Sequence, residues 1–102
     1  MKRSEINAII RDAGVFLAEY RFPLPPFATW SPNEWRGKGP ECFEIVERGL
    51  GWDITDWGTG DFAQHGLVLF TLRNGTLANL RAGSGKVYSE KVLIVQPGQR
   101  TP

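Results

Sequence analysis

A few side chains of this sequence have the chemistry for catalysis or binding, and His65 is the first to consider. His65 is the only histidine and Cys42 the only cysteine, so this chain alone cannot build a metal site from several imidazoles or thiolates. A general base or metal ligand at His65 would need a partner such as Asp61 or Glu90, and their spacing matches no metal motif. We therefore expect His65 to lie in a solvated loop.

Lys91 stands inside an otherwise apolar segment that is rich in β-forming residues. Side chains alternate along a strand, so Lys91 would share a face with Ser89 and Leu93, while Glu90 and Val92 occupy the other face. A lysine that points into the interior of a sheet needs a partner or a function. The residues alone favour the simpler interpretation, an exposed lysine or one that protects a sheet edge.

Aromatic and acidic side chains are the remaining candidates. The four tryptophans could form the wall of a sugar pocket, but large aromatic side chains more often fill cores and subunit contacts. They are Trp30, Trp35, Trp52 and Trp57. Three aspartates could coordinate a hard cation, but they lack the spacing of a calcium loop, so we expect them to cap turns. These are Asp53, Asp56 and Asp61.

Helices are expected in the first half of the chain. Apolar residues recur at three- and four-residue steps over 4–20, which predicts an amphipathic helix with Ser4 as its N-cap. Three prolines make 22–27 an extended, rigid connector. Residues 31–34 form a capping-box pattern that predicts a short helical turn, and a further short helix over 42–46 should close at Gly49.

Strands are expected in the second half. Residues 67–72 and 87–95 are rich in β-formers, and 52–57 alternates apolar with polar side chains. A loop or ragged hairpin is expected over 76–86. The fold class is therefore α+β, with a helical extension and Pro-rich connector over 1–50 and strands over 51–102. Two or three strands cannot close a sheet, so we expect open edges that can pair with another chain.

Composition excludes several classes of protein. The chain has 102 residues, 41% of them hydrophobic, which is enough for one domain or part of one. A net charge of +1 with dispersed basic residues argues against nucleic acid as a partner. No apolar stretch approaches the roughly 20 residues that span a membrane, and no signal-peptide pattern follows Met1. A lone cysteine suits a reducing compartment, so we expect a cytoplasmic protein.

Five blocks of the sequence resemble, in order, the N-terminal half of cupin-type D-lyxose isomerases. They are 1–7, 22–30, 50–58, 66–75 and 88–102. The resemblance implies that residues 51–102 are the first antiparallel strands of a cupin (jelly-roll) β-barrel, incomplete on its own. It also implies interconversion of D-lyxose and D-xylulose, with mannose and fructose as a related pair, and a divalent metal, usually manganese. A homodimer, or pairing with a C-terminal half, is the expected assembly.

The same resemblance assigns roles to particular residues. The family's metal ligands follow the block that ends at Pro102, so no metal is expected to bind this chain alone. Lys91 corresponds to a lysine that points into the barrel and contacts a substrate oxygen, where an ammonium would stabilise the charge of an enediolate-like transition state. Lys91 and Trp30 are the candidate substrate-binding residues. The alternative interpretation is a non-catalytic half that serves as an assembly or interaction module.

Overall fold

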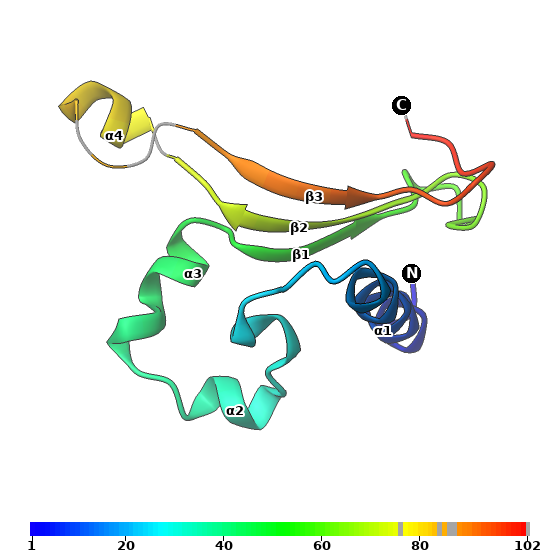
Figure 1. Cartoon of the computed structure of the whole chain (residues 1–102), viewed down its shortest axis with the longest axis horizontal. Coiled ribbons are helices and arrows are strands. Elements are labelled where there is room, and N and C mark those ends of the chain that lie inside the picture. The colour runs from blue at the N-terminus through cyan, green and yellow to red at the C-terminus, as the bar shows by residue number, and fades with distance from the viewer. Residues whose placement is uncertain (76, 84, 86–87, 102) are drawn as a thin grey trace. The chain divides into compact units, whose positions relative to one another are not determined.

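A computed structural model describes residues 1–75, 77–83, 85 and 88–101. The fold is α+β, as the sequence predicts: helices come first, and an open antiparallel sheet of three strands follows in the order β1-β2-β3 (Figure 1). The chain forms two compact units. One unit contains Met1–Pro23, Trp52–Leu69 and Leu93–Pro102, and the other contains Leu24–Gly51 and Phe70–Val92.

The helix of the first unit is α1, Arg3–Glu19, which confirms the amphipathic pattern. Ala13 and Leu17, one helical turn apart, are its buried residues. The N-cap is Lys2, which makes no side-chain capping bond. The expectation that Ser4 caps this helix is wrong, because the helix begins one residue before Ser4 and the serine already lies in its first turn.

Four short helical segments belong to the second unit. They are η1 (Pro26–Thr29), α2 (Pro32–Arg36), η2 (Pro40–Cys42) and α3 (Phe43–Glu47). The predicted capping box precedes α2: the Ser31 hydroxyl accepts a hydrogen bond from the Glu34 amide, and the Glu34 carboxylate accepts one from the Ser31 amide, both at 3.2 Å. The predicted close at Gly49 is also present, since Gly49 adopts a φ of +62° and the Leu50 amide donates to the Ile45 carbonyl.

The three strands are β1 (Gly51–Thr55), β2 (Leu67–Arg73) and β3 (Glu90–Ile94). β3 is shorter than the strand predicted over 87–95. Tyr88 and Ser89 lie before it and Val95 after it, and Val87 lies outside the described residues.

The loop or hairpin expected over 76–86 contains a helix instead, α4 (Leu77–Ala82). Leu, Ala and Arg, which dominate its sequence, are strong helix formers, so local propensity explains the difference. Thr76, Ser84 and Lys86 of that predicted segment lie outside the described residues.

Each unit has a small apolar core. In the first unit Val68 of β2 and Ile94 of β3 are buried, as are the two helix residues named above. In the second unit Phe70 is fully buried, and the Phe27 ring lies with its centroid 5.4 Å from that of Phe70. None of the described helices has both the length and the apolar composition needed to cross a bilayer.

Candidate functional site

Lys91 lies on β3, which is an edge strand of the sheet. The burial pattern along β3 has Val92 half-buried and Ile94 buried, whereas Lys91 and Leu93 are exposed. Strand alternation therefore places the lysine on the face opposite Ile94. Lys91 makes no ion pair with any described residue, while its neighbour Glu90 pairs with Arg73 at 2.7 Å.

Trp30 lies between η1 and α2 in a cluster of aromatic rings. Its ring centroid is 5.0 Å from that of Trp35 and 6.2 Å from that of Phe27, both edge to face. The Lys38 ammonium stands over the ring at 4.2 Å from its centroid, in cation–π geometry. A sugar that stacked on this ring would compete with these contacts. Within the described part of the second unit, no hydrogen bond, ion pair or ring contact joins Trp30 to Lys91.

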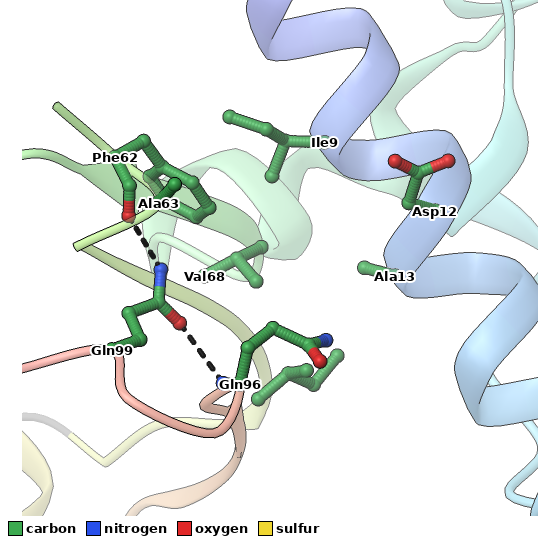
Figure 2. A pocket seen from close by; sticks show the side chains of 9 residues that line it. Ile9, Asp12, Ala13, Phe62, Ala63, Val68, Gln96 and Gln99 are labelled. Carbon is green, nitrogen blue, oxygen red and sulfur yellow. Dashed lines mark hydrogen bonds between the residues drawn. The ribbon is translucent and has the colours of Figure 1, made fainter. Parts of the chain in front are cut away.

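The first unit contains an open cavity of about 310 Å³ between α1 and the sheet (Figure 2). Its lining residues are Ile9, Asp12, Ala13, Phe62, Ala63, Val68, Ile94, Gln96 and Gln99. Most of the wall is apolar, and the polar groups are one carboxylate on α1 and two amides on the opposite side. The cavity suits an apolar side chain or a small, largely apolar molecule.

The Gln99 side chain links two segments that line this cavity. It is buried, its Nε2 donates to the Phe62 carbonyl at 2.7 Å, and its Oε1 accepts from the Gln96 amide at 3.0 Å (Figure 2). A Cβ on Gly66 would stand only 2.4 Å from the Phe62 carbonyl oxygen and 2.8 Å from the Gln99 amide nitrogen. Only glycine lets the chain pass so close to this pair of hydrogen bonds.

His65 lies at the end of the loop that joins β1 to β2. It is half-buried rather than fully solvated, its amide donates to the Asp61 carbonyl, and it forms an isolated parallel bridge with Arg100. The side chains of Asp56 and Asp61 accept hydrogen bonds from the amides of Gly58 and Gln64, which confirms turn capping for these two aspartates. For Asp53 the expectation is wrong, because this residue lies within β1.

The described residues do not fit a metal centre. No group of three or more His, Cys, Asp or Glu side chains converges anywhere in 1–75, 77–83, 85 and 88–101. The implied divalent metal therefore has no ligand set in the described part of this chain, and we derive no chemical step through it.

Sequence reasoning missed Gln99 and Arg100 as site residues. Both lie in the turn after β3, where the Pro97-Gly98 pair indicated a turn but not what the turn contacts. The Arg100 amide donates to the Gln64 carbonyl at 2.7 Å, a contact 36 positions back in the chain. Such long-range pairing has no local signal in the sequence.

The helices followed by an antiparallel sheet belong to the α+β class, and the D-lyxose isomerase family matches residues 1–102. The D-lyxose/D-mannose isomerase of Escherichia coli O157:H7 is 42% identical over 103 residues, and that of Serratia proteamaculans is 40% identical over the same length. The chain belongs to the D-lyxose isomerase family, whose fold is a cupin.

The alignments cover all of this chain but only part of each relative. Each alignment covers 100% of this chain but only 44% of the relative, and it falls in the relative's N-terminal part. The chain therefore spans less than half the length of the curated relatives that it matches.

Proposed function

We propose that this chain is the helical and first-strand part of an aldose–ketose isomerase that interconverts D-lyxose and D-xylulose, with D-mannose and D-fructose as a second pair. The single observation that carries this proposal is the match over the whole chain to the D-lyxose isomerase family, with 42% identity to a D-lyxose/D-mannose isomerase. The catalytic reaction would need the remaining part that the longer relatives have.

In this proposal Lys91 contacts a substrate oxygen. Its exposed ammonium on the open face of β3, without an ionic partner among the described residues, supports that role. A positive charge beside a sugar oxygen lowers the energy of the negative charge that develops when a proton leaves the adjacent carbon. Trp30 is the second proposed sugar contact, and its ring cluster would have to open on one side to admit the sugar.

The proposal also covers the domain organisation and the cofactor. Residues 1–50 would form a helical extension and residues 51–102 the first strands of a cupin barrel. Manganese or another divalent cation would be held by the part of the relatives that this chain does not cover.

A chimaera tests the proposed function. This chain would be joined to the remaining part of the E. coli O157:H7 relative, and D-xylulose formation from D-lyxose would be measured with added Mn²⁺, beside the chain alone. We expect activity in the chimaera and none in the chain alone. A folded but inactive chimaera, or equal activity in the short chain, would contradict the proposal.

Lys91→Gln in the same chimaera tests the residue. We expect kcat/KM to fall about tenfold or more, because a charged hydrogen bond to the reacting sugar is lost. Lys2→Gln, also at an exposed lysine, serves as the matched control and should leave the activity unchanged.

A second candidate function is a non-catalytic assembly module. The open sheet favours it, because β1 and β3 are the edge strands of the sheet that the described residues form, and Leu93 and Val95 are about half exposed. Sedimentation of the chain with and without the remaining part of the relative tests this idea. A stable complex that lacks isomerase activity would support the module over the enzyme, and a compact monomer that binds neither itself nor the remaining part would contradict it.

A further inference from the structure

A second cavity of the first unit lies between the loop that joins β1 to β2 and the segment that follows β3. Its volume is about 290 Å³, at the lower end of the range for small-molecule sites. Its lining residues are Trp57, Thr59, His65, Arg100 and Thr101. One tryptophan, one histidine, one arginine and two threonines therefore border one space, whose surface is mostly apolar.

The charge of this cavity favours an anion. Arg100 brings a permanent positive charge, His65 can add a second donor, and no acidic side chain is among the lining residues. The carboxylates of Asp56 and Asp61, in the neighbouring loop, accept hydrogen bonds from the Gly58 and Gln64 amides and are not among the residues that line the cavity. Neither Arg100 nor His65 makes a side-chain hydrogen bond or ion pair with the described residues, so both can turn toward a bound oxyanion.

Trp57, which lines the cavity, has an unfavourable backbone conformation. Its φ is +54°, a region that bulky side chains rarely adopt. The turn around it enforces this conformation: the Trp57 amide donates to the Thr55 hydroxyl at 3.0 Å, and the Gly58 amide donates to the Asp56 carboxylate at 2.8 Å. Trp57 remains 41% exposed, so the strained turn leaves apolar ring surface open to solvent in the wall that Arg100 also lines.

We infer that Trp57, His65 and Arg100 bind a monosaccharide that carries an oxyanion, either a sugar phosphate or a sugar acid. The guanidinium and the imidazole donate hydrogen bonds to the oxyanion, and the indole ring covers the C–H face of the sugar. The Thr101 hydroxyl supplies a neutral hydrogen bond to the sugar, whereas the Thr59 hydroxyl is held in its turn by bonds to the Asp56 carbonyl and the Asp61 amide. This inference does not rest on the proposed isomerase function, whose substrates are neutral sugars.

Titration of the isotope-labelled chain by NMR tests this site. D-mannose 6-phosphate, D-mannuronate, D-mannose and inorganic phosphate would be added separately, and the Trp57 indole N–H signal followed. We expect one of the two charged sugars to shift this signal saturably, with a dissociation constant at least about tenfold below that of D-mannose and of inorganic phosphate. Tighter binding of the phosphate or of the acid identifies which oxyanion the site prefers.

Two exposed positions provide the variants. Arg100→Gln should weaken binding of the charged sugar about tenfold or more, and Trp57→Asn, which tolerates the positive φ, should weaken it while relieving backbone strain. Because Trp57→Asn lacks the indole, binding to this variant is followed on the Gly58 amide signal, which is also recorded for the parent. Arg11→Gln, an exposed arginine on α1 outside the cavity, is the control and should bind like the parent. Equal affinity for charged and neutral sugars, equal affinity for phosphate alone, no binding, or binding unaffected by Arg100→Gln would each overturn the inference.

Discussion

At the scale of single residues, the amide of Gln99 is the clearest structural link in the first unit. Its Nε2 joins the turn after β3 to the loop before β2 through the Phe62 carbonyl, and its Oε1 closes the turn itself by accepting from the Gln96 backbone amide. We predict that Gln99→Met lowers the free energy of unfolding by about 1–3 kcal/mol, because the Phe62 carbonyl and the Gln96 amide lose their partner. Urea unfolding followed by circular dichroism measures this loss, with Gln64→Met at an exposed position as the control. A loss no larger than that of the control would contradict the prediction.

A second prediction for a single residue concerns the pH dependence of the Glu41 hydrogen bonds. Hydrogen bonds from its own backbone amide and from the Gly39 amide, with a smaller effect of the Lys38 charge, lower the pKa of the Glu41 carboxyl. A carboxyl whose pKa is lower in the folded state adds stability above its unfolded pKa and loses it as the pH falls through the folded value. We therefore expect the turn at η2 to loosen only in acid below the ordinary glutamate range.

The Gly39 amide signal in NMR reports this change directly. It should titrate with a midpoint below the ordinary glutamate pKa, and Glu41→Gln should abolish the titration. A midpoint at or above the ordinary value would show that the hydrogen bond does not hold the carboxylate.

At the scale of elements, we predict that the capping box at the start of α2 stabilises the folded chain. Ser31→Ala removes the hydroxyl that accepts from the Glu34 amide, and we expect a loss of about 1 kcal/mol in unfolding free energy. Ser4→Ala is a matched control, because Ser4 lies inside α1 and caps nothing. Chemical denaturation of both variants checks the pair, and equal effects would contradict the capping role.

The sequence predicts best those elements that are determined by residues close together in the chain. Hydrophobic periodicity predicts α1, the capping-box pattern of Ser31 and Glu34 predicts α2, and a run of β-forming residues predicts β2. The helix at Leu77–Ala82 was missed because flanking glycines suggested a loop, although its own residues favour a helix.

The candidate site was less predictable. Lys91 and Trp30 came from family resemblance, whereas the cavities at Gln99 and Arg100 arise from contacts between segments more than 30 residues apart. The contacts of Gln99 and Arg100 with the loop before β2 depend on tertiary packing, and no local pattern in a single sequence predicts such contacts.

At the scale of the whole molecule, stability depends on few buried side chains. Among the described residues the buried apolar set comprises Ala13, Leu17, Ala28, Val68, Phe70 and Ile94. Of these, Phe70 is the largest and is completely buried, whereas bulky side chains such as Phe43 and Val46 are more than 60% exposed. A chain with so small a core has little stability to lose, since typical domains have only about 5–15 kcal/mol in total.

Phe70→Ala should therefore affect the whole chain. Truncating a buried phenylalanine costs about 3–5 kcal/mol through lost burial and the remaining cavity, and here it also removes the ring contact with Phe27. We expect the variant to be largely unfolded at 37 °C by circular dichroism, while Phe43→Ala, at a 65% exposed position, melts close to the parent. If Phe70→Ala instead melted like the parent, the free energy of folding would have to come from contacts outside this ring pair, and the buried Phe70 side chain would not be a main source of the chain's stability.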